Sequence, residues 1–530
     1  MLSPSDATES TTCMQRKPSI PLDVSLDGVR SAQREWARVP IAQRISMVRA
    51  LRHRLASEAE IVAATVPTRL PGALHRTIAD TLVAEVLPLI EGCRFLERNA
   101  AKLLASRAPG GRGRPVWLGG VCTEIERVPW GVVLILAPAN YPLLLAGVQA
   151  LQALVAGNAV LWKPAPGTEA VAATMRSLLE QCGLPAALLT VLDADVETAR
   201  AALGAGVDHV VLTGSAETGV AVLHQLAETL TSCTMELSGC DAVFVLRGAE
   251  IKRTVHALLF GLRFNGSFTC MAPRRVFLVG LPEPEAELFE RKLLEGMRSL
   301  PPVPVSDPTQ IKIAAVLADA REHRAVIALD GTASGDDSGK GSGDDSGDDS
   351  IRLAATLLLR SNPEMLAMRQ DIFAPLLSVM RVATMDEALA ANDACPFALT
   401  AAIFGPERDA RVRARQLRVG HVLINDVIAP TADPRVAFGG RGRSGYGVTR
   451  GADGLLAMTT PRTVQLQRNP STRAYQQTTN RHAALFTGLI AALHSGNLKL
   501  RWRGLLSMIH AAKSLENNPR KKTNTRDTLR

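Results

Sequence analysis

The pattern of hydrophobic and polar positions divides the chain into a helical first part and a strand-rich remainder. Over residues 24–108 apolar positions recur every three or four residues, which predicts amphipathic helices. The run PGGRGRP at 109–115 ends this region, and the segment VWLGGVCTEIERV that follows it predicts an extended ribbon. The pattern changes again at residue 131, where continuous apolar runs begin.

From residue 131 short β-branched or Leu-rich runs alternate with helical stretches. The first set is GVVLILAP, GNAVLWKP, LLTVLDA and DHVVLTG, and the second is AVFVL, RRVFLVG, LLSVMRV, LTAAIFG and HVLIND. Apolar strands that alternate with helices are typical of a parallel sheet covered on both faces. The sequence therefore predicts an α/β protein with two domains of this kind.

Composition narrows the class of protein. The chain has 530 residues, of which 46% are hydrophobic, so it can bury a substantial core. No apolar run reaches the roughly 18 residues that cross a bilayer, and the first residues lack the pattern of a signal peptide. We expect a soluble cytoplasmic protein without a transmembrane segment, in which residues 1–24 form a disordered lead-in.

The net charge of +9 lies mostly near the C-terminus, where residues 499–530 hold nine Lys/Arg and two Asp/Glu. The rest of the chain is nearly neutral, which argues against nucleic-acid binding. Residues 469–530 form a basic amphipathic extension. We expect a helical appendage or a loose tail there, with weak docking to a membrane surface or a partner as the alternative.

Two further patterns concern metals and flexible segments. Residues 331–350 repeat the unit GDDSG, and we expect a flexible insertion rather than a calcium loop, because the ligand spacing of an EF-hand is missing. The eight cysteines form no C-x-x-C pair, so neither a disulfide framework nor a metal site is predicted.

Several residues could carry chemistry, although each also has an ordinary interpretation. Cys270 precedes a strand, Glu236 meets a Ser-Gly pair, and Asn140 lies between two prolines. The run TGSAETG at 213–219 follows a strand and opens a helix, where free backbone N–H groups can bind phosphate. It is neither a Walker A loop nor a G-x-G-x-x-G fingerprint. Taken singly, none of these signals identifies a function.

The order of seven short motifs is more specific. They are APANYP, WKPAPGTE, TGSAETG, ELSG, FNGSFTC, QDIFAP and AFGGRGRSGYG. Through them the chain resembles the aldehyde dehydrogenase superfamily over roughly residues 25–468. The resemblance implies two Rossmann-like parallel-sheet domains, a small oligomerisation arm, and a homodimer or homotetramer. The implied segments are 25–112 and 128–238 for dinucleotide binding, 239–450 for catalysis, and 113–127 with 451–468 for the arm.

The resemblance also implies a reaction, the oxidation of a small-molecule aldehyde to a carboxylic acid with NAD or NADP. Cys270 would be the nucleophile that forms a thiohemiacetal and then a thioester. The side-chain amide of Asn140 and the Cys270 backbone N–H would stabilise the oxyanion. Glu236 would activate the water that hydrolyses the thioester.

The cofactor and substrate residues follow from the same motifs. Those implied to bind the dinucleotide are Lys163, Gly214, Ser215, Gly219, Leu237, Asp371 and Phe373, and Phe438 would line the aldehyde pocket.

Departures from the family pattern leave alternatives open. They are Ala139, Pro166, Ser238, Pro273, Asp371 and Ala374. Pro166 replaces a Glu that binds the adenosine ribose in many members, so the choice between NAD and NADP stays open. A coenzyme A-acylating enzyme is one alternative, although Glu236 favours hydrolysis. The other is a weakly active dinucleotide-binding scaffold that docks through its C-terminal extension.

Overall fold

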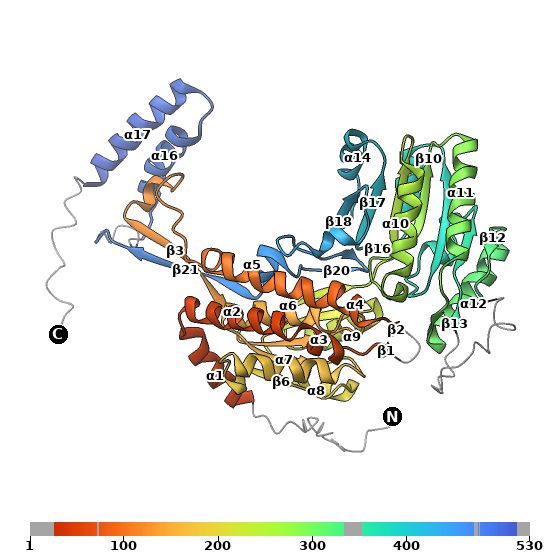
Figure 1. Ribbon diagram of the computed structural model, residues 1–530. Coiled ribbons are helices and arrows are strands. Elements are labelled where there is room, and N and C mark those ends of the chain that lie inside the picture. Colours follow the sequence, from red (N-terminus) through yellow and green to blue (C-terminus); the bar gives the residue numbers. More distant parts are fainter. Residues whose placement is uncertain (1–25, 71–73, 333–351, 471–474, 476, 517–530) are drawn as a thin grey trace, which may run out of the picture. The chain divides into compact units, whose positions relative to one another are not determined.

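The computed structural model (Figure 1) describes residues 26–70, 74–332, 352–470, 475 and 477–516. The chain divides into two units. The first unit comprises residues up to 107 together with 125–463, and it holds both large sheets. The second comprises residues 108–124 and those from 464 onward. The expected lead-in at 1–24 and nearly all of the expected insertion at 331–350 lie outside the described residues.

The first large sheet has six strands in the order β20-β8-β7-β4-β5-β6. Their bounds are β4 Val132–Leu136, β5 Ala159–Lys163, β6 Leu189–Val191, β7 His209–Gly214, β8 Ser232–Leu237 and β20 Gly445–Tyr446. All neighbours are parallel except β20, which runs antiparallel to β8. All five residues of β4 are buried, which explains the continuous apolar run in its sequence.

Helices cover this sheet and give it a hydrophobic core. Their bounds are α1 Leu26–Arg38, α2 Ile41–Ser57, α3 Ala59–Thr65, α4 Ile78–Thr81, α5 Leu87–Leu103, α6 Leu144–Ala156, α7 Glu169–Gln181, α8 Val196–Gly204, α9 Ala216–Ala227 and α15 Gly451–Ala457. A π-helical turn, η1 Leu82–Val86, joins α4 to α5. Every residue of α6 is buried, because this helix lies between β4 and β5 on one side and α2 and α5 on the other.

The second large sheet has seven strands in the order β12-β14-β15-β10-β9-β17-β18. Their bounds are β9 Asp241–Leu246, β10 Pro273–Val279, β12 Val326–Leu329, β14 Thr356–Leu359, β15 Leu376–Val382, β17 Thr400–Phe404 and β18 His421–Ile424. Only β12 is antiparallel to its neighbour. The sheet is therefore mixed, with a parallel interior.

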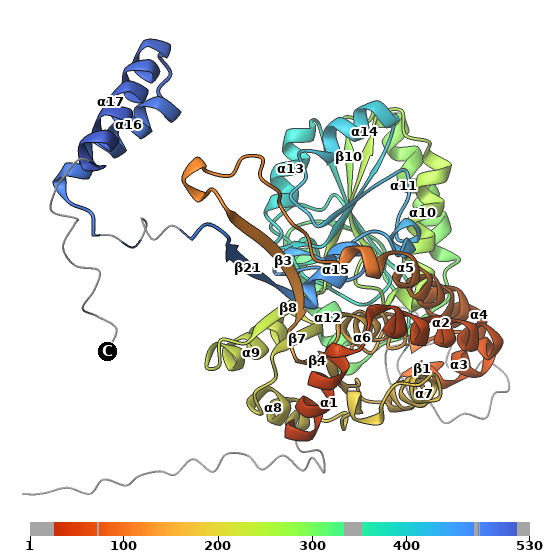
Figure 2. The ribbon, with the colours of Figure 1, turned by 90° about the vertical axis from the view of Figure 1, so that its left-hand side faces the viewer.

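Two hydrophobic clusters flank this sheet, and side chains of β9 alternate between them. Phe244 packs in the cluster that contains α12 Asp307–Glu322, α13 Met385–Asp393 and α14 Glu407–Ala414. Val243 and Val245 point to the opposite cluster, with α10 Ile251–Arg263 and α11 Glu283–Arg298. Figure 2 shows α10 and α11 on one side of β10, and α13 on the other.

The predicted α/β class is confirmed, and all nine predicted strands form. The strands β8, β12 and β14 were not predicted, although β12 and β14 carry the apolar runs VIAL and TLLL. The region predicted as helical also contains a short hairpin, β1 Arg69–Leu70 with β2 Leu74–His75. Finally, β20 joins the first sheet, although residues 239–450 were all expected in the catalytic domain.

The predicted arm is partly correct. The strands β3 Val121–Pro129 and β21 Thr459–Gln467 form a two-stranded sheet, preceded by a 3₁₀ turn at Val116–Leu118. The arm segment expected at 451–468 is extended only from Thr459, because residues 451–457 form α15. Leu455 is fully buried in the core of the first sheet, and packing against α5 and α6 favours the helix.

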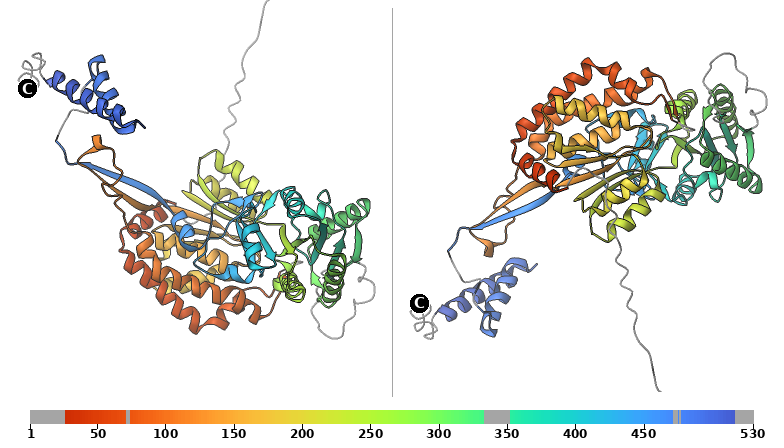
Figure 3. Two further views of the ribbon diagram at one scale, coloured as in Figure 1. Left: turned by 90° about the horizontal axis from the view of Figure 1, so that it is seen from above. Right: turned by 90° about the horizontal axis from the view of Figure 1, so that it is seen from below.

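The C-terminal extension contains two helices, α16 Ala483–His494 and α17 Leu498–Glu516. They lie side by side as a hairpin (Figure 3). The helical appendage expected from the sequence is therefore present in the described part of the extension.

Two glycines with the same backbone angle test how tightly β20 holds β8. Gly445 and Gly183 both have φ +93°, but a Cβ on Gly445 would lie 1.9 Å from the Met235 carbonyl oxygen, whereas Gly183 has open space. We expect Gly183→Ala to lower the free energy of unfolding by about 1 kcal/mol through backbone strain. Gly445→Ala should lower it by about 1–3 kcal/mol more through overpacking, and should reduce activity because Met235 adjoins Glu236. Urea unfolding measures both changes. If the two variants lost the same free energy of unfolding, the close approach of Gly445 to the Met235 carbonyl oxygen would not contribute to stability.

Candidate active site

Three residues that are far apart in the chain line one cavity of about 170 Å³. They are Asn140, Glu236 and Cys270. The loop after β4 carries Asn140, the end of β8 carries Glu236, and the loop before β10 carries Cys270. Ligand sites in parallel sheets lie at the carboxyl ends of the strands. The structure thus places Asn140 and Glu236 at such an edge of the first sheet, and the loop before β10 of the second sheet brings Cys270 to the same cavity.

The loop that carries Cys270 is held in a strained conformation. Asn265 and Ser267 have φ of +53° and +63°, which non-glycine residues rarely adopt. The buried guanidinium of Arg274 donates from Nη1 to Ser267 Oγ and to the Ala374 carbonyl oxygen, each over 2.8 Å. Its Nη2 donates to the Ser267 carbonyl oxygen over 2.8 Å. Arg274 therefore connects the loop that carries Cys270 to the loop that follows Asp371.

Cys270 lies among carboxylates. Burial raises the pKa of its thiol, and the charges of Glu236, Asp241 and Asp371 raise that pKa further. Arg450 is the positive group that acts in the opposite direction. The thiol is therefore protonated at neutral pH in the protein alone, and it must give up a proton before it can attack a carbonyl carbon.

Glu236 is a buried carboxylate with one oxygen available. Its Oε2 accepts a hydrogen bond of 2.8 Å from Thr449 Oγ1. Its Oε1 is buried and has no hydrogen-bond partner in the described part of the chain. Burial raises the pKa of Glu236, while Arg450 and Thr449 lower it. These properties suit a general base, which needs a raised pKa and a free oxygen beside the reacting atoms.

Arg450 supplies the positive charge beside Glu236 and Cys270. This residue is 7% exposed, and its guanidinium carbon lies 4.5 Å from the centre of the Phe438 ring. Its Nη1 donates to the Thr431 carbonyl oxygen over 2.7 Å. The ring and the carbonyl hold the guanidinium in place by cation–π attraction and hydrogen bonding.

Asn140 is oriented by its own loop. Its Oδ1 accepts a hydrogen bond of 3.0 Å from the Tyr141 N–H, and its Nδ2 has no acceptor among the described residues. The Tyr141 hydroxyl and Thr269 Oγ1 are 2.7 Å apart, which ties this loop to the residue before Cys270. The Asn140 amide therefore keeps a free N–H donor at the cavity.

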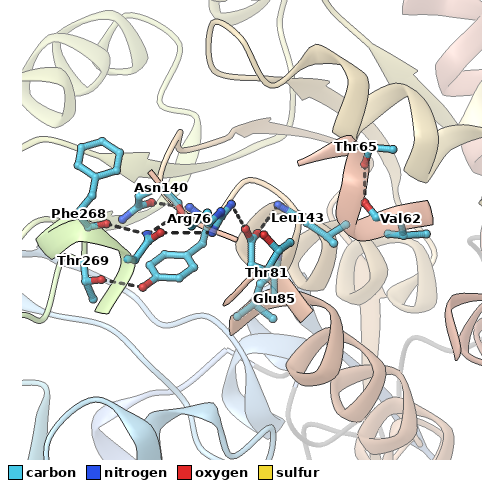
Figure 4. A network of polar contacts seen from close by, with 12 residues as sticks. Val62, Thr65, Arg76, Thr81, Glu85, Asn140, Leu143, Phe268 and Thr269 are labelled. Carbon is cyan, nitrogen blue, oxygen red and sulfur yellow. Dashed lines mark hydrogen bonds and ion pairs between the residues drawn. The ribbon is translucent and has the colours of Figure 1, made fainter. Parts of the chain in front are cut away.

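A buried network joins this loop to the first part of the chain (Figure 4). Arg76 and Glu85 form a fully buried ion pair, and Arg76 Nη1 also lies 3.4 Å from Asn265 Oδ1. Glu85 Oε2 accepts the N–H groups of Leu143 and Leu144 over 2.7 and 3.0 Å. The pair thereby connects the loop that carries Asn140 to the loop that carries Cys270.

The predicted phosphate-binding turn lies at the same edge. Gly214 ends β7 and lines the cavity together with Ser215 and Leu237. The side chain of Ser215 caps α9 by accepting the Thr218 N–H over 3.2 Å. The exposed start of this twelve-residue helix suits a pyrophosphate group. Gly219 does not line the cavity, and a Cβ there would lie 2.7 Å from Leu237 Cδ1, so its role is close packing of α9 on β8.

Asp371 and Phe373 fit the nicotinamide end of a dinucleotide. Phe373 lines the cavity and packs edge-on against Phe268, with 5.0 Å between the ring centres. Asp371 Oδ1 is buried without a partner among the described residues, so a ribose hydroxyl could satisfy it. Burial raises the pKa of Asp371 to about 6, against the opposing effects of Arg274 and Ser238. The carboxylate is therefore mostly ionised at neutral pH.

Besides Gly219 and Asp371, two further predicted site residues do not line the cavity. Lys163 ends β5 and does not line the cavity, although partial burial lowers its pKa. Phe438 is 2% exposed and lies under the guanidinium of Arg450, so its contact with a substrate would be indirect.

The family model described as "Aldehyde dehydrogenase family" matches residues 2–464 of this chain. The chain belongs to the aldehyde dehydrogenase family. This aldehyde dehydrogenase is an oxidoreductase that oxidises aldehydes with NAD or NADP, and a coenzyme A-acylating reaction is not favoured.

Similar proteins support this assignment. The chain is 29% identical to a 4,4'-diapolycopene aldehyde oxidase of Methylomonas sp., over 84% of this chain and 81% of that protein. It is 29% identical to a probable coniferyl aldehyde dehydrogenase of Pseudomonas aeruginosa, over 78% and 84% of the two chains.

Solved structures share the fold. Betaine aldehyde dehydrogenase of Staphylococcus aureus, in complex with NAD⁺, superposes with a TM-score of 0.74 at 22% identity, over 86% of this chain and 88% of that one. Methylmalonate-semialdehyde dehydrogenase of Oceanimonas doudoroffii gives 0.73 at 23% identity, over 85% and 91%.

Sequence reasoning missed four residues that position the site in this dehydrogenase: Arg76, Glu85, Arg274 and Arg450. No local pattern separates them from surface charges, since each acts through contacts with distant segments. The double arginine at the start of β10 was the one available signal, because charged residues are rare inside a buried strand.

The charge of Arg450 makes a prediction about pH. Since Arg450 lowers the pKa of Glu236, Arg450→Met should raise that pKa and shift the acid limb of the kcat profile to higher pH. Arg450→Lys keeps a positive charge and should shift the limb less. The profile is measured from NAD(P)H formation between pH 5 and 10, on variants shown by circular dichroism to be folded. An unchanged limb in the Met variant would show that Arg450 does not act on Glu236.

Proposed function

We propose that Cys270, Glu236 and Asn140 are the catalytic residues of aldehyde oxidation in this enzyme, and that a free acid is the product. The observation that supports this best is the single cavity that all three line. The unpartnered Glu236 Oε1 adds a proton acceptor at that cavity.

In the first half of the reaction Glu236 takes the thiol proton and Cys270 Sγ attacks the carbonyl carbon. The carbonyl oxygen becomes an oxyanion, which receives hydrogen bonds from Asn140 Nδ2 and the Cys270 backbone N–H. Bound NAD(P) supplies the hydride acceptor. Loss of hydride from the carbon leaves a thioester on Cys270.

Glu236 releases the thiol proton to solvent after the first half, which makes it a base again. In the second half it takes a proton from the attacking water, and the resulting hydroxide attacks the thioester carbon. The carbon–sulfur bond breaks, the carboxylic acid leaves, and Cys270 regains a proton. The raised pKa of Glu236 favours both transfers, because a carboxylate with the ordinary pKa would be a weaker base.

We propose that the dinucleotide follows the edge of the first sheet. The start of α9 at Gly214 and Ser215 binds the pyrophosphate, Asp371 and Phe373 hold the nicotinamide ribose, and Lys163 binds the adenosine ribose. The homodimer or homotetramer expected through β3 and β21, and the cytoplasmic location, stay predictions.

A second, small cavity suggests the shape of the substrate. It measures about 20 Å³ and is walled mainly by apolar groups of α5 and α6, with Arg450 at one side. Phe95, Leu96, Leu144 and Val148 form much of this wall. Because Arg450 also acts on Cys270, we propose that the aldehyde chain points toward this space, which has room only for its terminal methyl group. A narrow apolar cavity favours unbranched aliphatic aldehydes over branched or aromatic ones.

Variants of the three residues test the proposed reaction. Cys270→Ala should abolish NAD(P)H formation from aldehydes, whereas Cys182→Ala, on the far end of α7, should not change it. Asn140→Ala should lower kcat by about 100- to 1,000-fold. Glu236→Gln should lower it by about 100- to 10,000-fold. Coenzyme A should accelerate none of these proteins, and formation of an acyl thioester by the unmodified enzyme would contradict hydrolysis.

The small cavity gives a separate prediction on specificity. Leu144→Ala removes apolar volume from the wall, so kcat/KM for a branched aldehyde should rise relative to hexanal. Leu143→Ala is the matched control, since Leu143 is buried next to it but does not line the cavity. Equal selectivity of the two variants would place the substrate elsewhere.

A further inference from the structure

The hairpin of α16 and α17 has almost no core of its own. The buried residues among those described between 483 and 515 are Gly488 and Gly504. A Cβ on Gly488 would lie 2.7 Å from the Met508 backbone nitrogen, and one on Gly504 would lie 2.7 Å from the Ala492 backbone nitrogen. The two helices therefore meet backbone to backbone at these glycines. Their larger side chains are left outside the contact.

Large apolar side chains are consequently exposed on the hairpin. They are Phe486, Ile490, Leu498, Leu500, Trp502, Leu506 and Ile509, and Trp502 is 66% exposed. Seven such side chains on two short helices form more than the scattered apolar surface that soluble proteins tolerate. A partner that binds this surface must therefore present apolar groups to it.

The same hairpin carries an excess of positive charge. Residues 483–516 contain four Lys/Arg and one acidic residue, Glu516, at the very end of α17. In α17 the charges alternate with apolar residues, as Leu498, Lys499, Leu500, Arg501, Trp502 and Arg503. Arg501 Nη2 donates to the Leu493 carbonyl oxygen over 2.8 Å, but no cation of this helix forms an ion pair among the described residues. Their positive charge is therefore available to an outside partner. The partner must combine negative charge with apolar character.

We propose that the α16–α17 hairpin docks on the surface of a membrane that contains anionic lipids. Basic residues would contact the lipid headgroups, and the Leu, Ile and Trp side chains would enter the acyl boundary. A tryptophan next to arginines is typical of this interface. No described helix is long and apolar enough to cross a membrane, so the hairpin would lie along the surface.

The charge pattern disfavours the two other occupants. A second copy of the hairpin would bring two sets of uncompensated cations together, which is unfavourable. A nucleic acid would satisfy the cations but would leave the aliphatic side chains exposed to water.

Vesicle binding by the full-length enzyme tests this proposal. Co-sedimentation should show at least about tenfold tighter binding to vesicles of phosphatidylglycerol and phosphatidylcholine than to vesicles of phosphatidylcholine alone. In 0.5 M salt this preference should disappear, because salt screens the charges. The triple variant Lys499→Glu, Arg501→Glu, Arg503→Glu should lose the preference. Its matched control is Arg247→Glu, Lys292→Glu, Arg408→Glu, which changes exposed cations elsewhere and should bind like the unmodified enzyme.

The double variant Trp502→Ser, Leu506→Ser tests the apolar contribution. It should bind anionic vesicles more weakly while keeping its cations. All variants should oxidise a water-soluble aldehyde at the unmodified rate, so failure of docking is distinguishable from failure of the proposed catalytic residues. Equal binding to both vesicle types would overturn the proposal. So would light scattering that shows a dimer lost in the double variant, or a preference for RNA over anionic vesicles.

Discussion

Buried guanidinium groups hold the loops of this active site in place. Arg274 forms hydrogen bonds both to the loop that carries Cys270 and to the loop after Asp371. Arg76 lies between Glu85 and Asn265. Arg450 lies between the Phe438 ring and the Thr431 carbonyl. A planar group with five donors can bond several chain segments at once, which a lysine cannot do with the same geometry. Removing any of these side chains would leave buried acceptors without partners.

The charges around the cavity have a chemical consequence. Three carboxylates raise the pKa of Cys270, and Asp241 is itself buried deeply enough that its pKa rises to about 8. A thiol in these surroundings stays protonated, and protonated thiols react slowly with oxidants and electrophiles. The Cys270 thiol is therefore weakly reactive at rest, and Glu236, which lines the same cavity, is the base that we propose accepts its proton.

The departures from the family pattern are accommodated by local packing. Pro273 is the first residue of β10, a position where the missing N–H is tolerated. The Ala374 carbonyl accepts hydrogen bonds from Arg274 and from Ser267. Ser238 is held through its backbone, which bonds to Gly214 and to Ser444 Oγ, and its side chain acts on Asp371. Of the three, Ser238 itself lines the cavity.

The amino-acid sequence by itself determined the alternation of strands and helices, and the order of its motifs pointed to Cys270, Glu236 and Asn140 as the residues we propose for catalysis. Local patterns suffice for these features, because an apolar run or a short motif is a property of neighbours in the chain. Only the tertiary structure decided which charges surround the thiol, that Phe438 supports Arg450, and that Leu455 continues a helix. These depend on contacts between segments that are separated in the chain, and on burial, which changes the pKa of a group without any change in the local sequence.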